Sequence, residues 1–200
     1  SKLGDVWLLG NHRLVCGDCT DVIVVDSLMN GIVADIAFTS PPYALGNSIK
    51  IHGNKSFNKS SSAYTSHDDD PKKWPELMDG WWSASIGRVG AWIVNLQPLA
   101  GNKRALFSWI NDRVDFLVDV ITWDKGHTAP AMAASVLSSS YEWLIIFSSR
   151  NSSRSVPFSS WKGTVSNIYS GSGQRKNEFA NAHAATMPSH LPEWVIHTLC

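Results

Sequence analysis

The stretch "ADIAFTSPPYALG", residues 34–46, places several polar groups at the end of an apolar run. Prolines cannot donate hydrogen bonds to a sheet, so a strand that reaches Ser40 must stop where they begin. Ser40 offers a hydroxyl group, and Pro41 offers a carbonyl oxygen whose direction is fixed by the tandem prolines. Tyr43 adds a flat ring that stacks on planar ligands. Together these groups suit an exocyclic amino group on a heterocycle, which has protons to donate and a lone pair to expose.

A carboxylate follows an earlier strand. Asp18 comes just after the apolar pattern of residues 12–16. In α/β domains the site lies beyond the carboxyl ends of the parallel strands. We therefore expect Asp18 and Ser40 to lie on the same rim of one sheet. The carboxylate of Asp18 would accept a hydrogen bond from an amino or hydroxyl group, such as those of an adenosine.

Hydrophobic periodicity predicts the elements that position these groups. Two short strands flank Gly10-Asn11, and longer strands are expected at residues 34–40, 91–97, 115–125 and 141–150. Helices are expected from about residue 20 to Gly31, from Trp74 to Gly90, over 101–114 and from about Pro192. Strands that alternate with helices predict an α/β domain with a mostly parallel central sheet. Residues 44–70 and 150–180 are expected to form loops. The tryptophans expected in the core are Trp81, Trp82, Trp92, Trp123 and Trp143, while Trp161 could either contact DNA or join a smaller core.

The composition fits one globular domain with a sizeable core. The chain has 200 residues, of which 44% are hydrophobic, and its 17 basic and 17 acidic side chains cancel. Its three cysteines make no disulfide framework, no apolar run is long enough to span a membrane, and no signal peptide opens the sequence. We expect an intracellular protein without a membrane partner. Cys16 and Cys19 have zinc-like spacing but lack a second pair, so no metal site is predicted.

The charge is unevenly distributed. No acidic residue occurs between Trp143 and Asn177. The basic residues in this segment are Arg150, Arg154, Lys162, Arg175 and Lys176. Such a segment is either a surface that faces phosphates or an ordinary solvated loop, and charge alone does not decide between them.

The ordered set of motifs resembles a known enzyme family. "FTSPPY" resembles the catalytic motif of the permuted, beta-class DNA amino-methyltransferases, which use S-adenosylmethionine to methylate N4 of cytosine or N6 of adenine. The resemblance extends over nearly the whole chain through "GDVWLLGNHRLVCGDCTD", "GAWIVNL", "DVITWDKG", "SSYEWLIIFS", "WKGTVSNIY" and "NEFANAHAATMPSHLPEWVI". It implies a Rossmann-like methyltransferase fold and double-stranded DNA as the partner. The target base must leave the duplex, because its amino group is otherwise paired.

The resemblance also implies roles for particular residues. Ser40, Pro41, Pro42 and Tyr43 would form the catalytic turn that binds the flipped base. The cofactor would be contacted by Asp18, at its adenine end, and by Thr39, His183 and Pro188. DNA would be contacted by Arg154, Lys162, Arg175 and Lys176, with Asn167 and Asn177 as further candidates for base recognition. Serine before the prolines favours cytosine N4, and adenine N6 is the alternative.

The division into regions follows the same resemblance. Residues 1–148 would be the catalytic half, 149–180 the target-recognition region and 181–200 the start of the cofactor-binding half. The family continues into a strand and a glycine loop of the form D-P-F-x-G-x-G-T, which the 200 residues do not include. We therefore expect an incomplete sequence, or a cofactor site completed by a second chain or by a homodimer. Two other functions remain open: a DNA-binding module that has lost cofactor binding, and a methyltransferase acting on RNA or on a small heterocycle.

Overall fold

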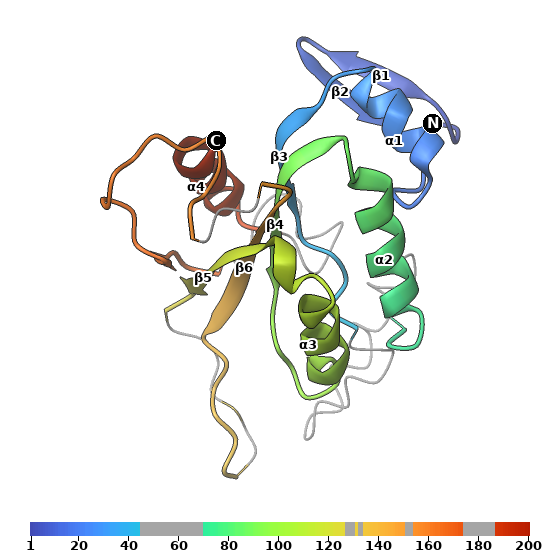
Figure 1. The fold of residues 1–200 in the computed structure, drawn as a ribbon. Helices are drawn as coiled ribbons and strands as arrows, with labels where there is room; N and C mark the ends of the chain where they lie inside the picture. The colour runs from blue at the N-terminus through green and yellow to red at the C-terminus, as the bar shows by residue number, and fades with distance from the viewer. Residues whose placement is uncertain (45–69, 127–130, 132–133, 151–153, 174–186) are drawn as a thin grey trace.

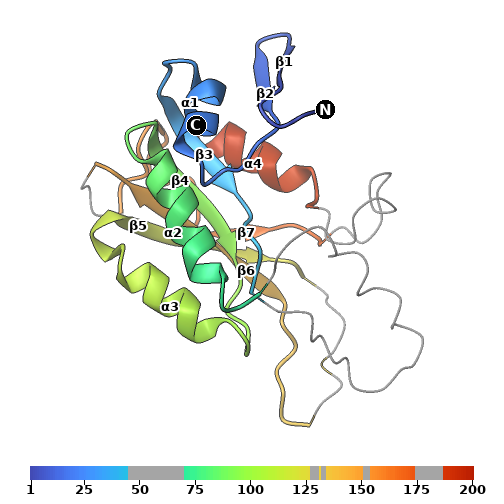
Figure 2. The same ribbon diagram turned by 90° about the vertical axis from the view of Figure 1, so that its right-hand side faces the viewer.

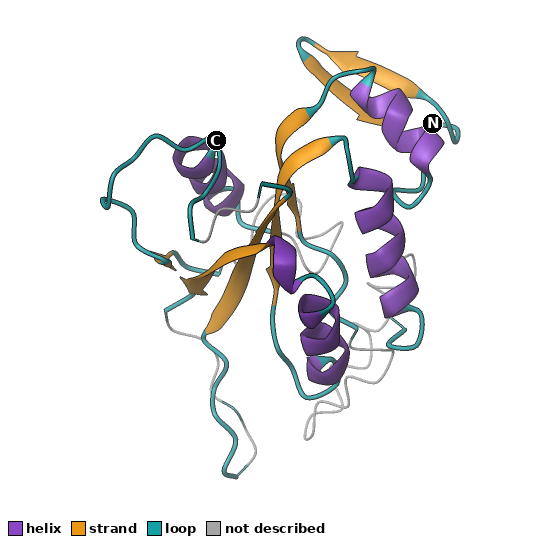
Figure 3. Ribbon diagram, in the orientation of Figure 1, coloured by secondary structure: helices purple, strands orange, loops and turns teal. Residues whose placement is uncertain are grey.

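The computed structural model describes residues 1–44, 70–126, 131, 134–150, 154–173 and 187–200, which form a mixed α/β fold (Figures 1 and 3). Its strands are β1 Val6–Leu9, β2 His12–Val15, β3 Ala34–Thr39, β4 Val89–Leu96, β5 Leu117–Asp124, β6 Tyr141–Ser148 and β7 Ile168–Ser170. Its helices are α1 Val22–Met29, α2 Trp74–Ser85, α3 Lys103–Asn111 and α4 His190–Leu199, with a 3-10 turn, η2, at Val114–Phe116. In this part of the chain, no helix is both long enough and apolar enough to cross a bilayer.

The central sheet has five strands in the order β3-β4-β6-β5-β7. β3 pairs with β4 in parallel and β5 pairs with β7 in parallel, but β6 is antiparallel to both of its neighbours. The prediction of a mostly parallel sheet is therefore wrong, because the sheet is mixed. The reason lies at the end of β5, where the backbone N–H of Lys125 donates to Ser140 O, so that β5 and β6 pair as a hairpin does.

The first two strands form a separate antiparallel pair. Gly10 turns the chain between them with a φ of 62°, and the prediction of two strands around this position is confirmed. The expectation that Asp18 and Ser40 lie on the same rim of one sheet is wrong, since among the described residues β2 pairs only with β1, while β3 belongs to the five-stranded sheet. Within the same residues, β3 has a single strand partner, β4, and forms one edge of the sheet.

The end of α2 differs from the prediction. The helix stops at Ser85, and Gly87, with a φ of 77°, reverses the chain. Gly90, which was expected to end the helix, lies inside β4. A side chain at Gly90 would stand 2.7 Å from the ring of Phe158 and 3.1 Å from the carbonyl oxygen of Asp35. The glycine is therefore required by the segment that packs over the sheet, and helix termination has no part in it.

The core lies on both faces of the sheet. α2 and α3 cover one face and α4 covers the other (Figures 1 and 2). Successive side chains of β4 point to opposite faces of the sheet. Trp92 and Val94 therefore pack under α2 and α3, while Ile93 faces α4. The predicted core role is confirmed for Trp82, Trp92 and Trp123, which are buried, while Trp81 and Trp143 are partly buried and pack against the core.

The segment after β6 is more ordered than the predicted loop. β7 adds a strand to the sheet next to β5. The hydroxyl of Tyr169, from β7, bonds His190 Nδ1 at 2.7 Å, and the Tyr169 ring stacks on Trp194 at 4.5 Å. These contacts join β7 to α4. Pro192 lies in the first turn of that helix. Backbone N–H groups in a first turn have no acceptor within the helix, so the N–H that proline lacks is not missed there.

Candidate functional site

The turn after β3 is held from outside by two side chains. The indole Nε1 of Trp74 donates to Pro42 O at 2.7 Å, and Asn102 Nδ2 donates to Tyr43 O at 2.7 Å. Ala44 follows with a φ of 56°, an uncommon conformation for a residue with a side chain. These bonds occupy two consecutive carbonyl oxygens of the turn and fix the path of the backbone.

The carbonyl of Pro41 differs from the two that follow it. Among the described residues, no hydrogen bond to Pro41 O is made. The nitrogen of Pro41 carries no hydrogen, and the next residue, Pro42, cannot donate either. The turn thus keeps one rigidly aimed acceptor for a ligand, directly beside the exposed Ser40.

Ser40 contacts a buried amide at the end of the neighbouring strand. Its Oγ donates to Oδ1 of Asn95 at 3.3 Å, and Asn95 is only 2% exposed. The other end of the amide, Nδ2, donates to Glu142 Oε2 at 3.0 Å and to Trp143 O at 3.2 Å. Because both of these partners are acceptors, they fix which end of the amide faces Ser40.

Tyr43 is tied to the same cluster through its hydroxyl group. The hydroxyl donates to Glu142 Oε2 at 2.8 Å, and Asn95 Oδ1, at 3.2 Å, is the longer alternative acceptor of the same proton. The second oxygen of Glu142 forms an ion pair with Lys125 Nζ at 2.9 Å. Both charged side chains are mostly buried, with 16% of Lys125 and 13% of Glu142 exposed. The ring of Tyr43 is therefore anchored by a nearly buried charge pair.

Three residues of this cluster were not predicted as site residues. Asn95, Lys125 and Glu142 each lie within or just beyond an apolar strand. A single amide or charge in such a strand is the available sequence signal, because a buried polar group needs partners. That signal does not identify the partners, which come from β4, β6 and the residue after β5. We call Ser40, Tyr43, Asn95, Lys125 and Glu142 the rim network.

Comparison with known proteins identifies the fold around the rim network. No protein-family model matches the sequence, and no curated protein matches it. Among solved structures, the chain is similar to PvuII DNA methyltransferase (cytosine-N4-specific), with a TM-score of 0.61 and 17% identity over 96% of this chain and 71% of that one. The chain has the fold of a DNA methyltransferase. At this identity the similarity establishes the architecture alone.

Asp18 follows the two-stranded sheet, whereas the rim network lies on the five-stranded one. It follows β2 in the separate hairpin, and its Oδ1 accepts hydrogen bonds from the backbone N–H and the hydroxyl of Thr20, both at 2.8 Å. The backbone bond, followed by the hydroxyl bond, lowers the pKa of the Asp18 carboxyl below its ordinary value. Oδ2 makes no hydrogen bond within the described part of the chain. It is an ionised acceptor that suits an amino or hydroxyl group of an adenosine.

Thr39 and Pro188, two further predicted cofactor residues, lie on other elements of the fold than Asp18 does. Thr39 is the last residue of β3 and pairs with Val94. Pro188 is buried before α4, where its carbonyl oxygen accepts from Leu191 N. His183 lies outside the described residues. A carboxylate that can accept hydrogen bonds, such as that of Asp18, fits the amino and hydroxyl groups at the adenosyl end of S-adenosylmethionine.

Arg154, one of the predicted DNA contacts, lies away from the rim network. Arg154 Nε pairs with Asp119 Oδ2 at 3.2 Å. Asp119 lies five residues before Asp124, roughly 17 Å along β5 at about 3.3 Å per residue, toward the opposite end of the sheet. Lys162 is exposed, and Arg175, Lys176 and Asn177 lie outside the described residues.

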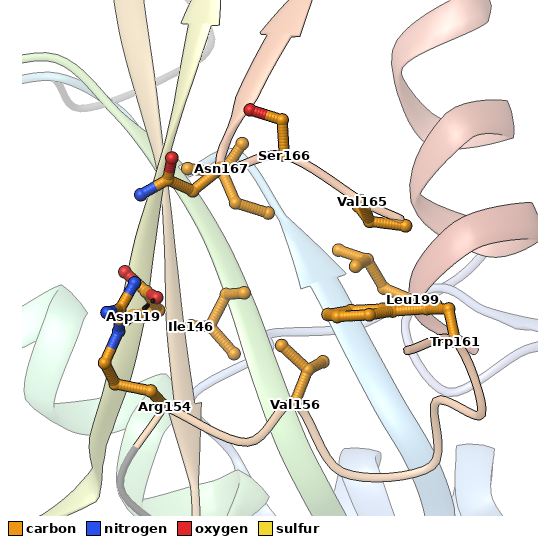
Figure 4. A pocket seen from close by; sticks show the side chains of 10 residues that line it. Asp119, Ile146, Arg154, Val156, Trp161, Val165, Ser166, Asn167 and Leu199 are labelled. Atoms are coloured by element: carbon orange, nitrogen blue, oxygen red, sulfur yellow. Dashed lines mark hydrogen bonds and ion pairs between the residues drawn. The ribbon is translucent and has the colours of Figure 1, made fainter. Parts of the chain in front are cut away.

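A pocket of about 330 Å³ opens beside Arg154 (Figure 4). Arg154 and Asp119 lie on one side of the opening, and Trp161 and Leu199 lie across from them. Its floor includes Ile146, and polar groups of Ser166 and Asn167 stand at its rim. The backbone oxygen of Asn167 also accepts from Thr122 N at 2.9 Å, which joins this segment to β5. The pocket is thus separate from the turn at Ser40.

Proposed function

We propose that this chain carries the target-base site of a DNA methyltransferase, which transfers a methyl group from S-adenosylmethionine to N4 of a flipped cytosine. The observation that carries the proposal is the pair of acceptors at the end of β3. The Pro41 carbonyl is without a partner among the described residues, and the Ser40 hydroxyl beside it is oriented by Asn95. Two neighbouring acceptors suit the two N–H groups of an exocyclic amino group.

The proposed reaction depends on the direction of the amino lone pair. Hydrogen bonds from the amino group to Ser40 Oγ and Pro41 O would hold both N–H groups and leave the lone pair facing the methyl donor. Tyr43 would stack on the base, and its hydroxyl bond to Glu142 would keep the ring from turning. Positioning of this kind accounts for a large part of the rate when two bound reactants must meet.

The proposed reaction is a direct displacement, in which the amino nitrogen of the base replaces sulfur on the methyl carbon. The amino nitrogen would bond to the methyl carbon as the bond from that carbon to sulfur breaks, and the bonding electron pair would leave with the sulfur. The nitrogen would then carry a positive charge and would release one proton to water, which would give N4-methylcytosine. No covalent bond to the protein is needed, in keeping with a turn that offers a hydroxyl and a carbonyl and no thiol.

Bound S-adenosylmethionine would supply the methyl group as an electrophilic carbon attached to a positively charged sulfur. Asp18 is the residue that we expect to hold its adenosyl end, through Oδ2. Thr39, His183 and Pro188 remain predictions that rest on the family resemblance. The same holds for the division into a catalytic half, residues 1–148, a recognition region, 149–180, and the start of a cofactor-binding half, 181–200.

The experiment is methyl transfer from labelled S-adenosylmethionine to unmodified mixed-sequence duplex DNA, followed by mass spectrometry of the nucleosides. We expect N4-methylcytosine, and we expect it to disappear in Ser40→Ala and in Tyr43→Ala. N6-methyladenine would preserve the mechanism and overturn the choice of base. Absence of any methylated nucleoside, together with absence of S-adenosylmethionine binding, would refute the enzyme and favour a DNA-binding module.

A second measurement separates DNA from a small substrate. Neutralisation of phosphates by basic side chains releases counterions, so affinity for duplex DNA should fall steeply as salt increases. A flat salt response would instead favour a small heterocyclic substrate. Lys162→Ala is the variant to compare here, since Lys162 is an exposed basic residue of the recognition region and forms no ion pair with the described residues.

A further inference from the structure

We propose that Lys125 and Glu142 are positioning residues that act on Ser40 through the side-chain amide of Asn95. They determine that the Ser40 hydroxyl donates its proton to Asn95 and presents its lone pairs to a ligand. This inference rests on the proposed function, because it concerns how Ser40 receives the amino group of the target base. It assigns a task to a charge pair that neither the turn motif nor the fold accounts for.

The first step is the charge on Glu142. Its Oε1 lies 2.9 Å from Lys125 Nζ, and its Oε2 accepts from both Tyr43 and Asn95. Three donors converge on one carboxylate, which is the environment that an ionised carboxylate needs when it is mostly removed from water. An ionised Glu142 can only accept, so the Tyr43 proton must lie between the two oxygens that are 2.8 Å apart.

The second step is the orientation of the Asn95 amide. Because Glu142 Oε2 and Trp143 O both accept, the amide must present Nδ2 to them. Its oxygen, Oδ1, then necessarily faces Ser40. If the amide turned over, its NH₂ group would face Ser40, and the carbonyl oxygen would meet two acceptors, which costs the hydrogen bonds of a buried polar group.

The third step is the consequence for Ser40. A hydroxyl group has one proton, and Oδ1 of Asn95 takes it at 3.3 Å. The lone pairs of Ser40 are then the groups left for a ligand, so Ser40 can accept from an amino group and cannot compete with it as a donor. A reversed Asn95 would donate to Ser40 instead and free the Ser40 proton to point at the amino nitrogen, whose lone pair must stay open for the methyl group.

The test exchanges the carboxylate of Glu142 and the amide of Asn95 in two steps. Glu142→Gln removes the charge at nearly constant shape and allows the Asn95 amide to turn over. We expect it to slow single-turnover methyl transfer by about tenfold to a hundredfold, the range expected for a misaligned reactive group. Asn95→Asp combined with Glu142→Gln restores an obligate acceptor opposite Ser40. The amide introduced by Glu142→Gln can donate to the other oxygen of the new carboxylate, which offsets the loss of the hydrogen bond that Asn95 Nδ2 donates to Trp143 O. We expect this double variant to be at least about tenfold faster than Glu142→Gln alone.

Two controls distinguish the effect of the Asn95 orientation from a general disturbance of side-chain packing. Glu76→Gln makes the same change at an exposed position in the first turn of α2 and should leave the rate unchanged. Lys125→Arg keeps the charge opposite Glu142 and should retain most of the rate that Lys125→Met loses. A Glu142→Gln rate within about threefold of wild type, or a double variant no faster than Glu142→Gln, would overturn the proposal.

A readout independent of activity keeps the two proposals apart. In wild type, the side-chain NH₂ of Asn95 is buried and donates to two acceptors, so its hydrogens should exchange slowly with solvent in nuclear magnetic resonance spectra. Glu142→Gln should accelerate that exchange, and Glu76→Gln should not. If the wild-type protein transfers no methyl group, the proposed function fails. Slow exchange that depends on Glu142 would then still support the orienting network, and fast exchange in wild type would overturn it.

Discussion

Trp74 and Pro42 are joined by a 2.7 Å hydrogen bond from the indole nitrogen to the carbonyl oxygen, so the first turn of α2 holds the tandem-proline turn. The indole is 1% exposed and belongs to the core under α2 and α3. We expect Trp74→Phe to lower the free energy of unfolding by about 1–3 kcal/mol, from the smaller ring and the lost bond. It should also slow methyl transfer, because Pro42 O and the neighbouring Pro41 lose a fixed direction.

Trp92 provides the matched control for this prediction. It is fully buried, and its indole nitrogen donates to Ser85 Oγ at 2.8 Å, away from the turn. Trp92→Phe should lower stability by a similar amount in urea titrations while leaving the methyl-transfer rate of the folded protein unchanged. Equal losses of activity in the two variants would show that stability alone is responsible, and that Trp74 has no particular role in aiming the turn.

The second prediction concerns Asn102, which binds three backbone groups. Its Nδ2 donates to Tyr43 O and to Gln97 O, and its Oδ1 accepts from Leu99 N. Since Asn102 is 1% exposed, Asn102→Ala removes three hydrogen bonds made by a buried side chain. We expect a loss of about 3 kcal/mol in the free energy of unfolding, measured by urea titration. Asn111→Ala, at the exposed end of the same helix, should cost less than about 0.5 kcal/mol.

The sequence predicted this turn better than it predicted what surrounds it. Two prolines after an apolar run fix a strand end, so Ser40 and its neighbours could be placed at a rim from local chemistry. The approach of Lys125, Glu142 and Asn95 could not be predicted, because it depends on the register of β4, β5 and β6. That register follows from an antiparallel return of the chain after Lys125, which local periodicity does not encode.

The same limit explains the other errors. Gly90 was expected to end a helix because glycine commonly does so, but its reason lies in Phe158, 68 positions later in the chain. β7 was missed because three residues paired on one side carry little periodicity. Asp18 was expected on the same rim as Ser40 because both follow strands, and nothing local indicates that the β1–β2 pair stays separate from the central sheet.

The third prediction follows from Gly90. A methyl group there would lie 2.7 Å from the ring of Phe158 and 3.1 Å from the backbone oxygen of Asp35, and the oxygen cannot move without disturbing β3. Gly90→Ala should lower the free energy of unfolding by about 1–3 kcal/mol, the usual cost of overpacking. Gly101→Ala meets only one atom, at 3.8 Å, and should be tolerated. Thermal unfolding of the two variants side by side would reveal the difference, and equal melting temperatures would contradict the close packing of Phe158.

The last prediction concerns pH and Asp18. Hydrogen bonds from Thr20 hold the pKa of the Asp18 carboxyl below its ordinary value of 3.8. A carboxyl whose pKa is lower in the folded state binds protons more readily when unfolded, so it adds stability above its unfolded pKa. That contribution declines as the pH falls through the folded value. Asp18→Asn should therefore reduce the free energy of unfolding at neutral pH and weaken its decline below about pH 4.

Thr20→Val tests whether the Thr20 hydroxyl has the expected share in this effect. It removes the hydroxyl bond to Oδ1 and keeps the backbone bond, which is the larger cause of the lowered pKa. The pH dependence of Thr20→Val should therefore lie between those of wild type and Asp18→Asn, nearer to wild type. Urea titrations from about pH 7 to about pH 3 would measure all three proteins. If Asp18→Asn declined with acid as steeply as wild type, the turn would not be what holds the carboxyl ionised, and its readiness to accept from an adenosyl group would lose its physical basis.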